Sequence, residues 1–189
     1  SYFSKNKSSY LTPEIDLRNK IKSNINNKEK LVCGLSWTSK NDDIGVNKSI
    51  VLETLEPALL SEIVFIDLQY NDTSREREKF YNDKGVKINK IEMIDNFNDL
   101  NGLISLIDLC DFVITVSNTN AHLSGALGKE TFLLLPKGKG KLWYWCSKKN
   151  KSLWYESIQI IEQEKIGVWD NSIIKLKKIL KEKIHDTIS

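Results

Sequence analysis

The 189-residue sequence contains few of the residues that build metal sites and disulfide frameworks. It has three cysteines, no two of them in a CxxC pair, and only two histidines, so no zinc-site spacing occurs. An odd number of scattered cysteines is typical of reduced thiols in a cytoplasmic chain. Cys33 and Cys110 lie beside apolar runs, and we expect both to be buried without a chemical role.

Long apolar runs and several catalytic signatures are also missing. No stretch approaches the roughly 18 apolar residues of a membrane span, and residues 1–27 are rich in Lys, Asn and Ser, unlike a signal peptide. No P-loop, HExxH motif or Ser-His-Asp order occurs, and the first apolar run ends in LSWTS instead of a GxGxxG loop. These absences argue against an NAD enzyme and a P-loop ATPase, and they predict a cytoplasmic chain without a membrane span or a metal.

Arginine is scarce, because the sequence has 25 lysines and three arginines at a net charge of +3. The lysines are interleaved with acidic residues, which is typical of a solvated surface. Lysine also lacks the planar fork with which arginine reads bases. We therefore expect no nucleic-acid partner; such a partner would give an affinity that depends steeply on salt.

The sequence does contain a regular alternation of short apolar runs and segments with helical spacing. Because the runs are nearly continuous, they predict strands buried on both faces of a parallel sheet with right-handed crossovers. The expected fold class is a Rossmann-like, three-layer α/β/α domain over residues 10–189, after a loose end at residues 1–9. Thr12 is expected to cap the first helix. We expect strands at residues 31–37, 62–68, 86–93, 112–116, 131–135 and 157–162, and helices at residues 12–25, 48–60, 73–84, 99–109, 118–127 and 171–184.

Such sheets bind ligands outside the carboxyl ends of their strands, which directs attention to the loops there. The most informative loop is Ser117-Asn118-Thr119-Asn120, four small polar residues at a predicted helix start. The first N–H groups of a helix are unpaired and lie at the positive end of its dipole, so this turn can hold a diphosphate. His122, in the first helical turn, is placed to donate to a phosphate oxygen. Ordinary helix capping, with His122 packed on its neighbours, explains the same residues.

Other candidate ligand residues follow the remaining strands. Ser36 and Lys48 flank the loop after the first strand, where a hydroxyl and a cation can bind phosphate. A solvated surface charge is the alternative for the lysine. Gln69 and Asp99 follow the second and third strands and are candidates for hydrogen bonds to a base or ribose, although capping is the simpler role for Asp99.

Aromatic side chains near these loops can stack on a base or a sugar. Tyr70 and Phe97 follow the second and third strands and are candidates for the wall of a nucleotide site. A second aromatic segment comprises residues 143–145, Trp154 and Tyr155. For most of that segment, packing over an irregular connection is the preferred interpretation.

One segment is specific enough to suggest a family. Residues 115–136, TVSNTNAHLSGALGKETFLLLP, resemble the signature of heptosyltransferase-like (family 9-like) glycosyltransferase domains, in particular those at the C-terminal end of bacterial tetratricopeptide-repeat proteins. Shorter pieces agree in order between about residues 10 and 180. They are Gly34-Leu35-Ser36-Trp37, Lys48-Ser49-Ile50, Leu68-Gln69-Tyr70, Phe97 with Asp99, and Trp143, Trp154, Tyr155 and Gln163.

The resemblance implies the C-terminal, donor-binding lobe of a B-type glycosyltransferase. The donor would be a nucleotide-diphosphate-sugar, and transfer would need no metal or other cofactor. Asn118, Thr119 and His122 would contact the diphosphate, with Lys48 and Ser36 as weaker candidates, and together with the helix dipole they would stabilise the leaving group. No catalytic residue is assigned, because an N-terminal acceptor-binding lobe usually supplies the base. We therefore expect little activity without that lobe.

Ser117 departs from the family pattern, which commonly has Asp at the start of this turn. The departure removes a carboxylate that would contact the ribose or the base. It favours the alternative hypothesis, a non-catalytic Rossmann-like interaction module whose partner is the repeat region of a tetratricopeptide-repeat protein.

Overall fold

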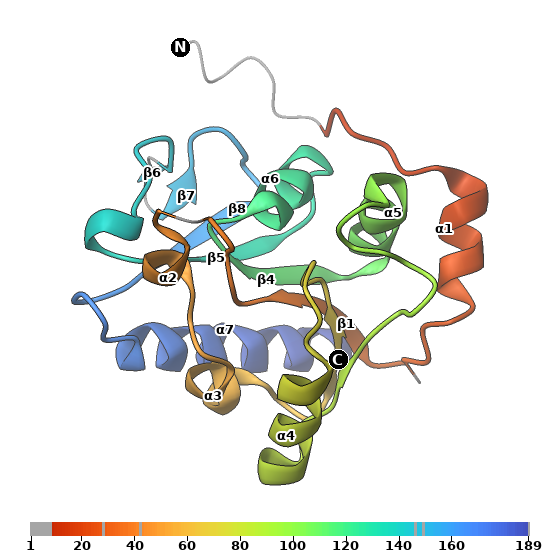
Figure 1. Ribbon diagram of the computed structural model, residues 1–189, viewed down its shortest axis with the longest axis horizontal. Coiled ribbons are helices and arrows are strands. Elements are labelled where there is room, and N and C mark those ends of the chain that lie inside the picture. Colours follow the sequence, from red (N-terminus) through yellow and green to blue (C-terminus); the bar gives the residue numbers. More distant parts are fainter. Residues whose placement is uncertain (1–8, 28, 42, 146, 149, 189) are drawn as a thin grey trace.

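The six apolar runs predicted as strands lie side by side in one sheet of the computed structural model, and all six are parallel (Figure 1). The structure describes residues 9–27, 29–41, 43–145, 147–148 and 150–188. In spatial order the parallel strands are β3 (Ile88–Asn89), β2 (Ile63–Asp67), β1 (Leu31–Ser36), β4 (Phe112–Val116), β5 (Thr131–Leu135) and β8 (Ile158–Glu162). An antiparallel edge of β7 (Lys151–Ser152) and β6 (Ser147–Lys148) follows β8.

Strand β1 marks the point at which the strand order reverses. Leu35 of β1 pairs with Asp67 of β2 on one side and with Ile114 of β4 on the other. The chain therefore crosses over β1 after it has formed β3. A reversal of this kind opens a crevice at the carboxyl ends of the two strands, because the loops that leave them turn in opposite directions.

Helices cover both faces of the sheet, which confirms the predicted α/β/α layering (Figure 1). Every residue of β4 and β5 is buried, as expected for strands covered on both faces. One face is covered by α1 (Ile15–Lys22), α5 (Leu100–Leu109) and α6 (Thr119–Ala126). The other face is covered by α3 (Leu52–Leu55), α4 (Ser74–Lys84) and α7 (Asp170–Ile188).

The single helix predicted at residues 48–60 is wrong. The segment forms α2 (Gly45–Lys48), an extended break, α3 and the 3-10 turn η2 (Glu56–Ala58). The break occurs because the Ser49 hydroxyl accepts from the Ser39 N–H at 2.9 Å and the Ile50 N–H donates to the Trp37 carbonyl at 2.9 Å. These bonds tie the chain to the loop after β1 instead of continuing the helix.

Three smaller expectations also need correction. Helix α1 begins at Ile15 with Glu14 at its N-cap position, so Thr12 does not cap it. Strand β3 has two residues where eight were expected, and the two-residue strands β6 and β7 were not predicted. Strands this short carry no alternation of polar and apolar residues that a sequence can reveal.

Two other sequence-based expectations concern burial. Cys33 and Cys110 are buried, as predicted, whereas Cys146 and residues 1–8 of the expected loose end lie outside the described residues.

Among the described residues, no helix combines the length and the apolar character that crossing a membrane requires.

Candidate functional site

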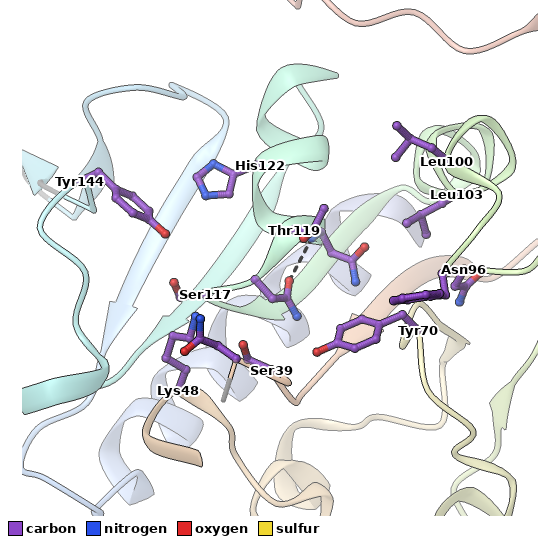
Figure 2. A pocket seen from close by; sticks show the side chains of 14 residues that line it. Ser39, Lys48, Tyr70, Asn96, Leu100, Leu103, Ser117, Thr119, His122 and Tyr144 are labelled. Carbon is purple, nitrogen blue, oxygen red and sulfur yellow. Dashed lines mark hydrogen bonds between the residues drawn. The ribbon is translucent and has the colours of Figure 1, made fainter. Parts of the chain in front are cut away.

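A pocket of about 430 Å³ opens at the carboxyl ends of β1 and β4, where the strand order reverses (Figure 2). This volume lies within the range of small-molecule sites. The walls come from the loops after β1, β2, β4 and β5, from the turn before α5, and from the starts of α5 and α6. The lining residues are Ser39, Asn41, Lys48, Tyr70, Asn96, Phe97, Leu100, Leu103, Ser117, Asn118, Thr119, Asn120, His122 and Tyr144.

The start of α6 forms the floor of the pocket and is capped by Asn118. The side-chain oxygen of Asn118 accepts from the Asn120 N–H and from the Thr115 hydroxyl, both at 3.0 Å. Its side-chain nitrogen donates to the Ser36 hydroxyl at 2.8 Å and to the Thr38 carbonyl at 3.1 Å. The amide of Asn118 is therefore committed to joining the helix start to the end of β1, as the capping interpretation expects.

Capping leaves part of the helix terminus available. Thr119, the first residue of α6, is exposed and lines the pocket. No acceptor among the described residues bonds its N–H, which lies at the positive end of the helix. Capping and anion binding are thus compatible here, because the side chain of Asn118 caps while the Thr119 N–H stays open.

Lys48, at the end of α2, is the one lysine in the described lining of the pocket. Only 6% of this residue is exposed, although the polar end of its side chain reaches the pocket (Figure 2). No carboxylate of the described residues forms an ion pair with it. Burial lowers the pKa of its ammonium group, because a desolvated charge without a partner is unfavourable.

His122 stands on the pocket wall inside a group of aromatic rings. Its imidazole stacks on Trp145 with ring centres 4.8 Å apart, and the centre of the Tyr144 ring lies 5.4 Å away. Nδ1 lies 3.2 Å from the Tyr155 hydroxyl. Burial lowers the pKa of His122, and the positive charge of Lys48 lowers it further. His122 is therefore mostly neutral near pH 7 when the pocket is empty.

Three of the five aromatic residues in the segment after β5, namely Tyr144, Trp145 and Tyr155, pack against the core as predicted, and Trp154 is 49% exposed. Trp145 is buried and donates through Nε1 to the Ser117 hydroxyl at 2.8 Å. Ser117 thus both lines the pocket and anchors the ring behind His122. Trp143, by contrast, is 82% exposed.

The opposite side of the pocket is aromatic and apolar. The rings of Tyr70 and Phe97 have centres 6.3 Å apart, and Leu100 and Leu103 lie beside them. Figure 2 shows Tyr70 and both leucines across the pocket from Lys48, His122 and Tyr144. Tyr70 and Phe97 both line the pocket; their role toward a nucleotide stays a prediction. The pocket therefore has a cationic side and a side suited to a flat, weakly polar group.

Asn96 also lines the pocket and was not identified as a ligand residue from the sequence, whereas Asn120 was considered only as part of the turn at the start of α6. The Asn96 amide donates to the carbonyls of Asp67 at 3.1 Å and Gln69 at 3.0 Å, and the Asn120 amide donates to Leu68 at 2.9 Å. The side-chain oxygen of each is buried and lacks a hydrogen-bond partner among the described residues. In the sequence both look like ordinary asparagines of a turn or a helix start, so no signal separates them from capping residues.

Three predicted ligand residues do not line the pocket. Ser36 and Gln69 are 1% and 0% exposed and lie beneath it. The side-chain oxygen of Gln69 accepts from the Ser36 hydroxyl at 2.6 Å and from the Trp37 N–H at 3.0 Å. Asp99 caps α5 by accepting from the Gly102 N–H at 2.8 Å. Contrary to the prediction, these three side chains do not face the pocket; they hold the strand ends and the helix start around it.

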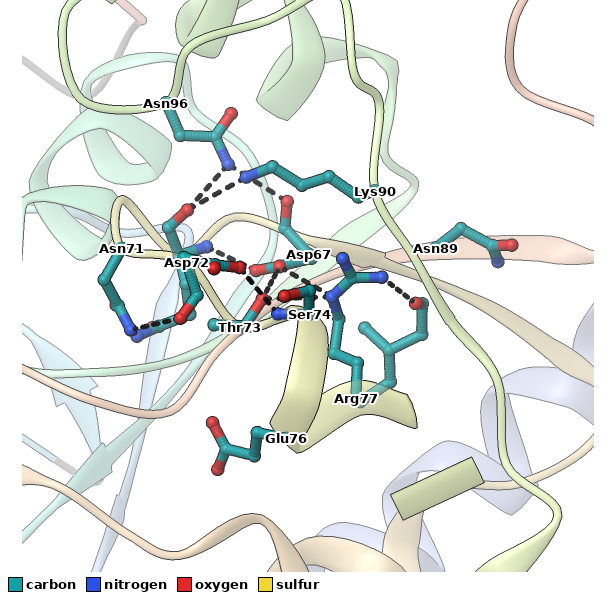
Figure 3. Close-up of polar contacts among 12 residues, drawn as sticks. Asp67, Asn71, Asp72, Thr73, Ser74, Glu76, Arg77, Asn89, Lys90 and Asn96 are labelled. Carbon is teal, nitrogen blue, oxygen red and sulfur yellow. Dashed lines mark hydrogen bonds and ion pairs between the residues drawn. The ribbon is translucent and has the colours of Figure 1, made fainter. Parts of the chain in front are cut away.

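A buried polar network holds the loop that carries Tyr70 (Figure 3). Asp67 is fully buried, accepts from the Gln69 N–H at 2.7 Å and from the Thr73 hydroxyl, and pairs with Arg77 at 3.2 Å. Lys90 donates to the Gln69 carbonyl at 3.1 Å. Burial raises the pKa of Asp67, which these donors counteract. The network is structural, because none of Asp67, Thr73, Arg77 and Lys90 lines the pocket.

The charge balance of the pocket is one-sided. Its described lining includes one lysine and one histidine but no aspartate or glutamate. The lining therefore favours an anion, and it offers a divalent cation no carboxylate ligand.

Comparison with known proteins shows the fold. No family model matches the sequence. The protein FlbA of Caulobacter vibrioides is 30% identical over 129 residues, which cover 67% of this chain and 21% of FlbA. The solved E. coli ADP-heptose LPS heptosyltransferase II superposes with a TM-score of 0.61 at 10% identity, over 92% of this chain and 54% of that one. E. coli heptosyltransferase WaaC, solved with ADP, gives a TM-score of 0.49 at 12% identity, over 97% of this chain and 53% of WaaC.

The chain thus spans about a fifth of FlbA and about half of each heptosyltransferase. At the identity found, the superposition on heptosyltransferase II is informative about fold and not about activity. The chain has the α/β fold of part of a heptosyltransferase.

Proposed function

We propose that this chain is the donor-binding lobe of a metal-independent glycosyltransferase and that its pocket binds a nucleotide-diphosphate-sugar. The observation that carries the proposal is Lys48, a buried ammonium group without an ion pair among the described residues, in a pocket whose described lining contains no acid. Burying a charge without a partner is costly. A bound anion would supply the missing partner.

The arrangement of the two sides of the pocket supports a nucleotide diphosphate over a simple anion. Lys48, His122 and Thr119 all line the pocket, and the charge of Lys48 is near enough to lower the pKa of His122; the diphosphate would bind among these groups. Tyr70 and Phe97 lie on the other side, where the base would pack against their rings. The volume of about 430 Å³ accommodates a ligand of that length.

The same groups would assist transfer. When the bond between the sugar and the diphosphate breaks, negative charge develops on the departing diphosphate. Lys48, the Nε2 side of His122 and the α6 terminus would stabilise that charge, and their positions are set before the reaction starts. No described lining residue is a carboxylate that could deprotonate an acceptor, so the base would come from an acceptor-binding lobe. We accordingly expect binding without transfer from this chain by itself.

A non-catalytic interaction module is the second candidate function. Ser117 favours it, because this position lacks the carboxylate common in the family and is engaged by Trp145. Under this hypothesis the partner is another part of a tetratricopeptide-repeat protein. The repeat context and the cytoplasmic location belong to the proposal.

Titration calorimetry with ADP, UDP, GDP and inorganic pyrophosphate tests the primary proposal. We expect all four to bind and the nucleotides to bind more tightly than pyrophosphate, because only they reach Tyr70 and Phe97. No heat with any of the four at millimolar concentration would refute the proposal. Equal affinity for pyrophosphate and all three nucleotides would refute the assignment of the aromatic side to a base.

Replacing His122 separates the two candidate functions. We expect His122→Ala to weaken pyrophosphate binding by about tenfold, the effect of losing one hydrogen bond to a charged group. The interaction-module hypothesis instead predicts a change in stability with binding unaltered. His185→Ala is the matched control, because His185 is an exposed residue of α7 and does not line the pocket.

The pH dependence of stability gives a second measure of His122. Its folded-state pKa is lowered from 6.5, so the unfolded chain binds the proton more readily. The free energy of unfolding of the wild type should therefore fall as the pH drops below 6.5. His122→Ala should lose that part of the acid sensitivity and His185→Ala should keep it, as measured by urea denaturation between neutral and mildly acidic pH.

A further inference from the structure

Tyr155 touches His122 from an element distant in the sequence. It lies in the connection between the edge strand β7 and strand β8. Its hydroxyl is 3.2 Å from Nδ1 of His122, and its ring centre lies 5.9 Å from the imidazole centre in an edge-on arrangement. Tyr155 is absent from the pocket lining, so its contact with the site runs through His122.

The position of Tyr155 is set by its backbone and by α6. Its N–H donates to the Ser152 hydroxyl at 3.3 Å, and its carbonyl accepts from the Ile158 N–H at 3.0 Å. Its ring packs directly on Gly125, where an added Cβ atom would come within 2.4 Å of the ring. Gly125 lies one helical turn after His122, so the glycine lets the tyrosine approach the face of α6 from which His122 projects.

The imidazole therefore has little freedom to turn. Trp145 stacks on it at 4.8 Å with an interplanar angle of 23°, and Tyr155 holds its Nδ1 edge. Nε2 is the remaining ring nitrogen, and no described residue forms a hydrogen bond with it. It is thus the nitrogen that remains available to a bound anion.

We infer that Tyr155 is a positioning residue that donates its hydroxyl proton to Nδ1 of His122 and so keeps the proton of the neutral imidazole on Nε2, where it serves the anion side of the pocket. A neutral imidazole carries one N–H, and the partner of the other nitrogen decides which one it is. In the opposite tautomer Nε2 would present a lone pair to a phosphate and repel it. The inference rests on the proposed function, because it needs an anion in the pocket.

The protonation of Tyr155 is consistent with a donor role. Burial raises the pKa of its phenol, and a hydrogen bond with Tyr10 raises the pKa further. The hydroxyl therefore keeps its proton across the physiological pH range. Because the bond with Tyr10 raises this pKa, Tyr155 is the donor in it, so Tyr10 and Nδ1 of His122 are alternative acceptors for the same proton.

The test is Tyr155→Phe, which keeps the ring on Gly125 and removes only the hydroxyl. ¹⁵N NMR of the imidazole nitrogens reports the tautomer directly, and assignment is simple because the chain has two histidines. We expect a pure Nε2–H form for His122 in the wild type and a mixture of tautomers in Tyr155→Phe. Pyrophosphate affinity should fall about three- to tenfold in the variant. Tyr81→Phe, at an exposed tyrosine of α4, should change neither quantity.

The two readouts separate the inference from the proposed function. An Nδ1–H tautomer in the wild type, or an unchanged tautomer in Tyr155→Phe, would overturn the role of Tyr155 whether or not pyrophosphate binds. The expected tautomers with unchanged affinity would also overturn it, because the orientation would then not serve binding. A wild type that binds no pyrophosphate would instead contradict the proposed function.

Discussion

Lys48→Met should reduce the affinity for pyrophosphate and for nucleoside diphosphates by about 10- to 100-fold, which is the range for losing a hydrogen bond to a charged group in a partly desolvated site. Methionine keeps the length and apolar character of the buried stem and removes only the charge. Calorimetry on the purified variant measures the loss. Lys139→Met, at an exposed lysine outside the pocket, is the matched control and should bind as the wild type does.

The same substitution should not weaken the unliganded fold. Lys48 is desolvated and has no ion pair among the described residues, so its charge opposes folding while the pocket is empty. Its folded-state pKa lies below the ordinary 10.5, so the unfolded chain holds the proton more tightly. The free energy of unfolding of the wild type should consequently rise as the pH approaches 10.5, and this rise should be smaller in Lys48→Met. A variant that binds pyrophosphate normally, or one that unfolds during purification, would contradict the role given to Lys48.

Arg77→Met should strongly destabilise the fold, lowering the free energy of unfolding by about 3–5 kcal/mol. The reason is its partner: Asp67 is fully buried and Arg77 is the cation that pairs with it at 3.2 Å. Removing the guanidinium leaves the desolvated carboxylate with only the charge of Lys90 nearby, which is unpaired among the described residues, and also removes the bond from Arg77 to the Ile88 carbonyl at 3.1 Å. Urea denaturation at neutral pH measures the loss.

Arg75→Met, two residues earlier on the exposed side of the same helix, isolates the effect of the pair and should cost little. The stability difference between the variant and the wild type should also depend on pH in a definite direction. The folded-state pKa of Asp67 is already raised by burial and should rise further without Arg77, so Asp67 becomes neutral in the folded variant as the pH falls. The stability difference between Arg77→Met and the wild type should therefore shrink at lower pH. A difference that grows on acidification, or equal losses for Arg75→Met and Arg77→Met, would show that the buried pair does not hold this loop.

The layers of the fold could be read from local patterns. The apolar runs that became β4 and β5 are buried at every position, and this is what predicted a sheet covered on both faces. The prediction of one continuous helix after β1 was wrong, because hydrogen bonds to distant residues interrupt a segment that has helical spacing. The Ser49 hydroxyl bonds to Ser39 and Gly45, and the Ile50 N–H donates to the Trp37 carbonyl at 2.9 Å.

The sequence likewise predicted some parts of the candidate site and misplaced others. The turn from Ser117 to Asn120 was found because small polar residues at a helix start have a local meaning, and capping by Asn118 is indeed present. Ser36 and Gln69 lie at the predicted strand ends, but their side chains are buried beneath the pocket and do not line it. A loop position in a sequence does not specify whether a side chain points into a cavity or beneath it.

By itself, the sequence determined the alternation of strands and helices, the parallel sheet and the helix start that faces the crevice, because each of these follows from residues within a few positions of one another. Only the tertiary structure decided that Lys48 is buried without an ion pair among the described residues, that Asn96 lines the pocket, and that Tyr155 holds His122. Solvation and hydrogen bonding are properties of neighbours in space, and Tyr155 is 33 positions away from the imidazole it contacts.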